Sequence, residues 1–458
     1  MNGPGVRWTA DQVLALAPDA VSKKAGGRLA TAGPWSGTGS GDGAVWGLCK
    51  GSGSKPYQTV VDTTGPAYKC SCPSRKFPCK HALGLLLLWA GDAGAMADET
   101  VPEWAGQWLE PRRERAEARQ AQSGESGESG GEPVAGAADA EAARRRAERR
   151  AGRISAGATE LEQRLTDLLR GGLASAEQAG YGLWEETAAR MVDAQAPGLA
   201  ARVRELGAIP GSGRDWPVRL LEECALLHLM DTAWLGRERL PGPLAATVRS
   251  RVGINAPADG TPVRDRWRIL AQYDSSDGKV TTRRIWVHGT ESGRTALLLS
   301  FGAAGRSPQL ALPVGGELSG VLVPYPGAGQ LRAELREQSG LTGGPAAPPP
   351  GGSVTAALDA YGQALCDDPW LESWPVTLTD VVPVPVPGGS GPHWQLADAN
   401  GEAAVPLTPA ALSRPGLWKL VSLSGGGPVT VFAECGHTGA TPLAAWSPAA
   451  GPEPIPLV

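Results

Sequence analysis

The chain has 458 residues, with 43 Lys and Arg against 47 Asp and Glu, and seven cysteines. This length predicts two to four domains. An odd number of cysteines and the lack of an apolar leader after Met1 argue against a secreted protein held by disulfides. The longest apolar run, Leu83 to Ala90, is too short to cross a bilayer. We therefore expect a cytoplasmic protein that does not enter the membrane.

Two short helices and a β-hairpin are expected at the N-terminus. Thr9 and Gln12 have the spacing of a capping box, which predicts a helix start, and a second helix is expected over residues 19–30. Three β-rich runs follow at residues 44–50, 57–62 and 67–71. The Gly and Ser residues between the first two runs are typical of a hairpin turn. We expect these elements to frame a small domain.

The next feature is a cluster of four metal-binding side chains in the arrangement Cys-x-Cys-x6-Cys-x-His: Cys70, Cys72, Cys79 and His81. Residues two apart on a strand point to the same face, so Cys70 and Cys72 at a strand end can present both sulfurs together. Residues two apart inside a helix diverge, so Cys79 and His81 can converge only around a helix start. Pro78 and the apolar periodicity after it predict that start. Three thiols and one imidazole are the ligand set of a closed tetrahedral zinc site.

A disulfide is the less favoured interpretation of these cysteines. Cys70 and Cys72 would close a strained ring, and the third cysteine would stay unpaired. With four protein ligands, the expected Zn²⁺ has no open position at which to activate water, so its role is structural. Such a site can supply roughly 10–16 kcal/mol of folding free energy in small zinc-finger peptides.

The stretch from about Trp8 to Trp89 resembles the SWIM-type zinc finger, whose pattern is Cys-x-Cys, a variable gap and Cys-x-His. All four ligand positions of that family match residues of this sequence. The resemblance implies a module that binds DNA or protein. The layout of the whole chain resembles bacterial SWIM-finger proteins suspected of acting with AAA+ ATPases and von Willebrand-type partners.

Nucleic-acid binding would use cationic and aromatic side chains around the metal ligands. Four basic residues flank them: Lys69, Arg75, Lys76 and Lys80. Tyr68 and Phe77 could stack on bases, although Phe77 could equally cap the zinc core. Residues 1–91 hold ten Lys or Arg against four Asp or Glu, which permits nucleic-acid binding without requiring it.

A change of composition marks residues 111–153, which follow an expected helix containing Trp104 and Trp108. Arg, Glu, Ala, Ser and Gly dominate this segment. It cannot bury enough apolar surface to offset its ordering entropy, so we expect a flexible linker with a helical tendency in its second half. Its arginine run could touch phosphate, but the interleaved Glu residues favour a solvated helix.

Apolar residues recur at helical spacing over residues 154–252, which predicts a bundle of four short helices. The Gly171-Gly172 pair ends the first of them. Cys224 and His228 lie four residues apart on an apolar face, as metal ligands can. Because no third ligand lies nearby in sequence, we interpret both as core residues.

Strands are expected from residue 253 onward. A hairpin is expected over residues 267–273 and 280–287 and is continued by residues 295–301. After a Pro/Gly-rich break we expect a helix over residues 354–366 and strands at residues 394–396, 403–407, 418–423 and 429–435. The sequence thus predicts a multidomain α+β protein with five parts: a small ββα-like zinc module (1–110), a linker (111–153), a helical domain (154–252) and two β-rich domains (253–342 and 353–458).

No catalytic constellation is evident in the sequence. The glycine-rich run at residues 37–41 precedes a strand rather than a helix, which argues against a dinucleotide-binding loop. The segment Glu434-Cys435-Gly436-His437 places a Cys near a His, but we interpret it as a strand end. We therefore do not expect an enzyme. Two functions remain: a zinc-stabilised adaptor or scaffold for other proteins, and a nucleic-acid-binding protein that uses the basic surface around the metal ligands.

Overall fold

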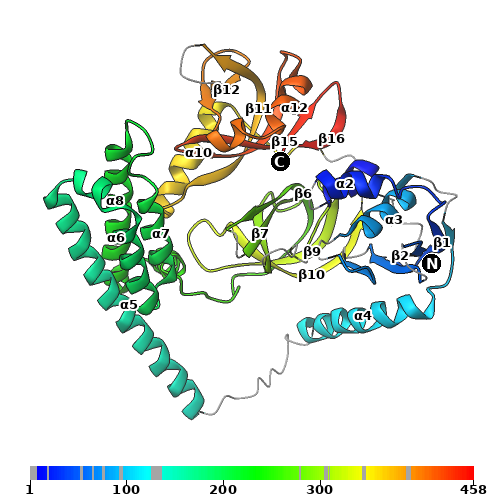
Figure 1. The fold of residues 1–458 in the computed structure, drawn as a ribbon, viewed down its shortest axis with the longest axis horizontal. Coiled ribbons are helices and arrows are strands. Elements are labelled where there is room, and N and C mark those ends of the chain that lie inside the picture. The colour runs from blue at the N-terminus through cyan, green and yellow to red at the C-terminus, as the bar shows by residue number, and fades with distance from the viewer. Residues whose placement is uncertain are drawn as a thin grey trace.

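The structure is a computed structural model. It describes residues 8–17, 20–51, 55–63, 67–74, 78–91, 96–124, 137–277, 280–303, 308, 310–342, 347–387 and 393–458. Within these residues the chain is a multidomain α+β protein (Figure 1). A small N-terminal domain lies at one side of a β-barrel, a helical domain lies at the other side, and a C-terminal domain covers the top in this view.

The N-terminal domain is a five-stranded sheet with helices packed on it. Its strands have the order β4-β3-β2-β1-β5, in which only β1 and β5 are parallel. The strands are β1 (Trp35–Gly41), β2 (Ala44–Cys49), β3 (Tyr57–Asp62), β4 (Ala67–Cys70) and β5 (Ala97–Asp98). The helices are α1 (Ala10–Ala15), α2 (Ala20–Gly27), α3 (Lys80–Gly91) and α4 (Glu103–Gly124). The predicted capping box is confirmed, because Thr9 accepts from the Gln12 backbone while the Gln12 side chain accepts from the Thr9 N–H.

Strand β1 lies in the glycine-rich run that the sequence analysis left outside the sheet. Glycine has low strand propensity, so the run carried no strand signal. The structure supplies the reason for one of these glycines. Gly39 pairs with Trp46 on β2, and a Cβ at residue 39 would lie 2.7 Å from the Trp46 ring. The Trp46 ring thus fills the space that a side chain at residue 39 would occupy.

Helix α4 covers the sheet face opposite to α3. Its buried Ala105 and Leu109 pack with Trp46 and Val60, as expected for a helix that packs back onto this domain. The helix continues through Pro111 to Gly124. Helix α5 begins at Ala137, so the second half of the expected linker is helical in the structure. Residues 125–136 lie outside the described residues.

The helical domain contains the four predicted helices and one more. The predicted helices are α5 (Ala137–Gly171), α6 (Ala174–Asp193), α7 (Pro197–Gly207) and α8 (Trp216–Leu235). A 3₁₀ turn, η1 (Arg237–Arg239), then leads into α9 (Gly242–Arg251), which the sequence analysis missed. Helix α9 is short and buries only Thr247 and Val248, so it lacks a long apolar stripe.

The central domain is a closed barrel of five strands. They are β6 (Val263–Ser276), β7 (Val280–Gly289), β8 (Thr295–Ala303), β9 (Glu317–Pro324) and β10 (Arg332–Thr342). The first three form the predicted antiparallel hairpin and its continuation. Strands β9 and β10 were not predicted; β9 closes the barrel against β6, and β10 closes it against β8 in a parallel pair.

The C-terminal domain is a six-stranded sheet of order β13-β12-β11-β14-β15-β16 with three helices. The strands are β11 (Ser373–Val386), β12 (His393–Asp398), β13 (Ala404–Pro406), β14 (Val429–Gly436), β15 (Gly439–Ser447) and β16 (Gly451–Pro456). The helices are α10 (Val354–Asp367), α11 (Pro409–Leu412) and α12 (Gly416–Ser424). Helix α10 confirms the prediction over residues 354–366.

The prediction of a strand over residues 418–423 is wrong, because this segment is helix α12. Its N-cap is Pro415, and it ends at Gly425, which has a left-handed φ of 52°. Leu417 and Leu420, three residues apart, are buried, whereas Trp418 is 64% exposed. Pro before and a left-handed Gly after a segment are helix boundary signals, and here they outweigh the β propensity of the residues between them.

The domains share apolar cores rather than meeting only at polar surfaces. One continuous cluster joins Trp8 and Leu86 of the N-terminal domain to Trp267 and Ile285 inside the barrel. The outer barrel residue Trp286 packs on Phe432 of the C-terminal sheet. These parts of the chain therefore pack tightly against one another through apolar side chains.

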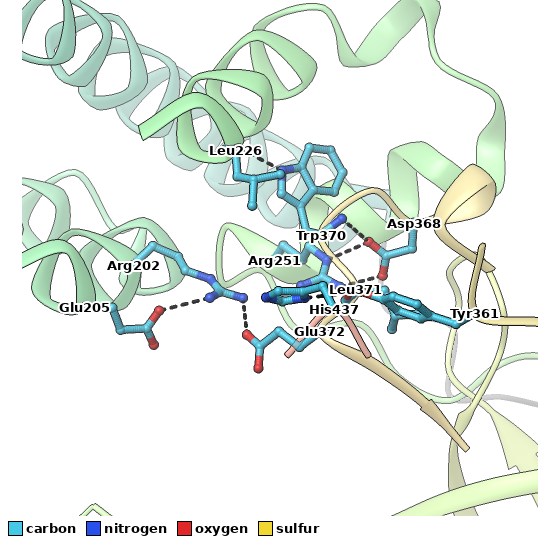
Figure 2. A network of polar contacts seen from close by, with 10 residues as sticks. All are labelled: Arg202, Glu205, Leu226, Arg251, Tyr361, Asp368, Trp370, Leu371, Glu372 and His437. Carbon is cyan, nitrogen blue, oxygen red and sulfur yellow. Dashed lines mark hydrogen bonds and ion pairs between the residues drawn. The ribbon is translucent and has the colours of Figure 1, made fainter. Parts of the chain in front are cut away.

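A buried tryptophan joins the C-terminal domain to the helical domain. Trp370, just after α10, is 5% exposed and belongs to the core of the helical bundle. Its Nε1 donates to the Leu226 carbonyl at 2.9 Å, and Arg251 forms two hydrogen bonds with Asp368 beside it (Figure 2). Arg202 binds Glu372 at 2.6 Å at the edge of the same contact.

Candidate metal centre

The four predicted metal ligands come together at the junction of β4 and α3. Cys70 is the last residue of β4, and Cys72 follows it by two residues. Cys79 lies immediately before α3, and His81 is the second residue of that helix. The four donor atoms all lie within 4.8 Å of one another. This is the strand, knuckle and helix arrangement that the spacing predicted.

The donor distances fit a single tetrahedral metal ion. The His81 Nδ1 atom lies 3.6 Å from the Cys70 sulfur and 4.0 Å from the Cys79 sulfur. A zinc ion at its usual bond lengths would place a sulfur and a nitrogen ligand about 3.5 Å apart. Within the described residues, this is the one group of at least three Cys, His or acidic side chains close enough to share a metal.

The surroundings hold the ligands in place. Cys79 is 1% exposed and His81 is 5% exposed, whereas Cys70 and Cys72 are partly buried. The Thr59 hydroxyl lies 3.2 Å from the Cys70 sulfur, and the Tyr57 ring packs 4.9 Å from the His81 ring. These contacts come from β3 and limit the rotamers of two ligands before any metal binds.

The thiols of Cys70 and Cys79 shift each other's pKa in opposite directions. A hydrogen bond with Cys79, together with bonds to His81 and Thr59, lowers the pKa of Cys70 to about 4 despite its partial burial. The same interaction with Cys70, reinforced by burial, raises the pKa of Cys79. A metal cation would replace the shared proton and hold all three groups as thiolates, which are the ligands that zinc binds.

The basic residues predicted near the ligands are only partly described. Lys69 and Lys80 are both exposed and flank the ligands from β4 and α3. Arg75, Lys76 and Phe77 lie outside the described residues. Tyr68 is not a free stacking platform, contrary to the prediction, since its ring packs against the core shared with the barrel and its hydroxyl oxygen is buried.

Cys224 and His228 differ in their surroundings. Cys224 is buried on α8 as predicted, but His228 is not a core residue, because its side chain is 61% exposed. Its Nδ1 lies 2.6 Å from Glu162 on α5. Glu162 also interacts with Asp231, a fully buried carboxyl group that the sequence analysis missed. Burial, followed by the charge of Glu162, raises the pKa of Asp231 to about 9.

This carboxyl group predicts a pH-dependent stability of the helical domain. Because the folded-state pKa of Asp231 lies above its ordinary value of 3.8, the stability it contributes is complete below pH 4 and is lost as the pH rises towards 9. We expect Asp231→Asn to gain stability relative to the unsubstituted protein as the pH rises from 5 to 8, by at least ~1 kcal/mol. Urea unfolding of both proteins at pH 5 and at pH 8 measures this. The same difference in unfolding free energy between variant and unsubstituted protein at the two pH values would contradict it.

The segment with a neighbouring Cys and His has structural contacts in the fold. Cys435 is buried in β14, and the His437 ring lies 3.3 Å from the Tyr361 hydroxyl. Glu434 accepts hydrogen bonds from Tyr273 at 2.7 Å and from Trp286 at 2.8 Å, both on the barrel. Glu434 thereby joins the barrel to the C-terminal sheet.

In the part of the chain that the structure describes, no helix combines the length and apolarity needed to span a bilayer.

Comparison with known families agrees with this geometry. Residues 61–90, which contain all four ligands, match the SWIM zinc finger family. Residues 149–252, which contain the helical domain from within α5 to the end of α9, match the SWIM-associated four-helix bundle domain. No curated protein and no solved structure gives a significant match to the chain. The chain therefore contains a segment that matches the SWIM zinc finger, whose four clustered side chains form a possible Cys3His metal site, followed by a segment that matches the four-helix bundle domain associated with that finger.

Proposed function

We propose that this chain is a cytoplasmic, non-enzymatic adaptor that binds other proteins, and that its metal is a structural Zn²⁺. The observation that carries the proposal is the closed ligand set of Cys70, Cys72, Cys79 and His81. Four protein ligands fill a tetrahedral zinc ion and leave no position for a substrate or a reactive water. The metal then stabilises the finger rather than performing chemistry.

The position of the finger supports a structural role. Its helix α3 is buried along most of its length, and its apolar core continues into the barrel. The metal ligands lie at the edge of this core, with Cys70 and Cys72 packed against it. Zinc binding would therefore hold β4 and α3 together at the point where the finger meets the rest of the chain.

The chemical class of the partner follows from the family resemblance. Bacterial SWIM-finger proteins of this layout are suspected of acting with AAA+ ATPases and von Willebrand-type proteins, and we propose a partner of one of these kinds. Co-elution of the zinc-loaded chain with a purified partner of either kind, from the same organism, tests this. Formation of a stable complex is the expected result. Separate elution of both candidates at micromolar concentration would contradict the choice of partner.

Nucleic-acid binding is the second candidate function, because Lys69 and Lys80 are exposed beside the metal ligands. It predicts that the anisotropy of labelled DNA or RNA rises on titration with the chain. For a duplex, the affinity would fall by ~0.9 log units per log unit of salt for each phosphate contact.

A triple variant, Arg75→Ala, Lys76→Ala and Lys80→Ala, separates the two candidates. If the basic surface binds nucleic acid, the variant loses affinity and its salt dependence becomes shallower. Lys24→Ala, which removes an exposed lysine on α2, is the matched control. No binding at low salt by the unsubstituted chain would exclude the second candidate and leave the adaptor.

A further inference from the structure

A cavity of about 630 Å³ lies where three domains meet. Its walls are α9 and the segment after it, the loop between β9 and β10 with the first residue of β10 (residues 325–332), and residues of the segment 364–374, from the end of α10 to the start of β11. Small-molecule sites in proteins occupy cavities of roughly 300–1,000 Å³ and occur preferentially at domain interfaces. The size and position of this cavity are therefore those of a ligand site, and it lies apart from the metal ligands.

Positive charge predominates among the residues that line the cavity. They include Arg249, Arg251 and Arg332 but only one acidic residue, Asp368. Arg251 neutralises Asp368 through two hydrogen bonds of 3.0 and 2.5 Å. Arg249 is exposed at the end of α9, and the buried Nε of Arg332 has no hydrogen-bond acceptor among the described residues. Two guanidinium groups thus remain for an anionic ligand.

Two aromatic residues, Tyr325 and Trp374, also line the cavity. The guanidinium carbon of Arg332 lies 4.3 Å from the centre of the Tyr325 ring. Trp374 lines the cavity beside Gly329, where a Cβ atom would lie 3.3 Å from the ring. Arginine and aromatic faces together are the surroundings in which nucleobases and phosphates are bound.

The loop between β9 and β10 is built to approach a ligand closely. Gly327 and Gly329 have φ angles of +142° and +71°, which residues with side chains rarely adopt. The Thr247 hydroxyl accepts a hydrogen bond from the Ala328 N–H at 2.8 Å, so α9 fixes the loop. Because Gly327 and Gly329 have no side chain, a ligand in the cavity can approach the loop backbone closely.

The barrel topology points to the same loop. Strands β6, β7 and β8 form a meander, β10 pairs in parallel with β8, and β9 closes the barrel between β10 and β6. This is the strand order of an OB-fold, in which ligands bind against the second and third strands and the loops after the first and fourth. Here the loop after the fourth strand is residues 325–331. The cavity lining includes this loop and no residue of the second or third strand, and Trp286 of the second strand is covered by the C-terminal sheet.

We infer that the cavity binds a nucleotide unit, either as a free nucleotide or as part of a single-stranded nucleic acid. Arg249 and Arg332 bind the phosphate, and the base lies against Tyr325 or Trp374. The inference goes beyond the adaptor function and is independent of the metal site. It predicts that both the phosphate and the base are needed for binding.

Calorimetric titration of the full zinc-loaded chain tests this with ATP, AMP, adenosine, inorganic phosphate and a short oligo(dT). We expect ATP, AMP or the oligonucleotide to bind, and adenosine and phosphate to bind about tenfold more weakly or worse. Binding of the mononucleotides identifies a free nucleotide, and binding of the oligonucleotide alone identifies a strand. No binding of any probe at millimolar concentration, or phosphate binding as tightly as ATP, would overturn the inference.

Variants locate the binding in the cavity. Arg332→Ala should weaken binding about tenfold or more. Because Arg332 packs on Tyr325, Arg249→Gln at an exposed position provides a second variant that leaves the fold intact and should also weaken binding. Arg146→Gln, at an exposed position of α5 outside the cavity lining, is the control. Equal affinities in all three variants would place the ligand elsewhere and overturn the inference.

Discussion

Replacing Cys79 by Ser should abolish metal binding and destabilise the finger. Cys79 is almost fully buried and joins the end of the knuckle to the start of α3. A serine hydroxyl is a poor zinc ligand in place of a thiolate, and a structural zinc site contributes roughly 10–16 kcal/mol in isolated zinc-finger peptides. We expect the zinc content to fall from one ion per chain to near zero, and amide exchange in β3, β4 and α3 to rise by orders of magnitude.

The matched control for this variant is Cys49→Ala. Cys49 is a buried cysteine on β2 of the same sheet, but it is not one of the four clustered ligands. We expect this control to keep one zinc ion per chain, with at most a modest loss of stability from the smaller side chain. Full zinc retention in Cys79→Ser, or loss of zinc in both variants, would contradict the assigned ligand set.

Replacing Trp370 by Ala should uncouple the C-terminal domain from the helical domain. The Trp370 ring lies in the core of the bundle, and its N–H donates to the Leu226 carbonyl of α8 (Figure 2). Truncation of a buried tryptophan to alanine costs about 3–5 kcal/mol. We expect amide exchange in α8 to accelerate by roughly two to three and a half orders of magnitude, since ~1.4 kcal/mol corresponds to a factor of ten.

Trp418→Ala provides the comparison within the C-terminal domain. Trp418 is 64% exposed on α12 and has an edge contact with Trp394, so its removal should leave exchange in α8 unchanged. If Trp370→Ala also left the amide exchange rates in α8 unchanged, the tryptophan would not be a stabilising link between the two domains.

The metal site could be predicted because its information is local. All four ligands lie within twelve residues, and the periods of a strand and a helix decide where each side chain can point. The helices of the bundle were likewise visible, since α5 to α8 each repeat buried residues at helical spacing. Helix α9 was missed because only two of its residues are buried.

Other features depend on residues distant in sequence. Trp370 follows α10 but is buried in the bundle more than a hundred residues earlier in the chain, and no local pattern indicates this. Strand β11 contains Pro383 and Pro385, which argue against a strand. Beyond Val381, β11 pairs with β12 on one side, and its pairing with β14 on the other side has ended. The unpaired side of the strand needs no N–H donor, so prolines are tolerated there. His228 was misplaced for a similar reason, since its partner Glu162 belongs to another helix.

The relation of the finger to the barrel was also beyond the sequence. Tyr68 stands beside the first ligand and resembles an exposed stacking residue in the sequence. In the fold it packs against a core that includes Trp267 of β6. A side chain near a metal ligand can thus serve domain packing rather than recognition, and only the tertiary structure distinguishes the two.

The central claim is that Cys70, Cys72, Cys79 and His81 bind one structural zinc ion. X-ray absorption at the zinc K-edge of the full purified chain tests it most directly. The account predicts one zinc per chain with three sulfur ligands at about 2.3 Å and one nitrogen ligand at about 2.0 Å. A shell dominated by oxygen or nitrogen, or a chain that folds and retains no zinc, would contradict it.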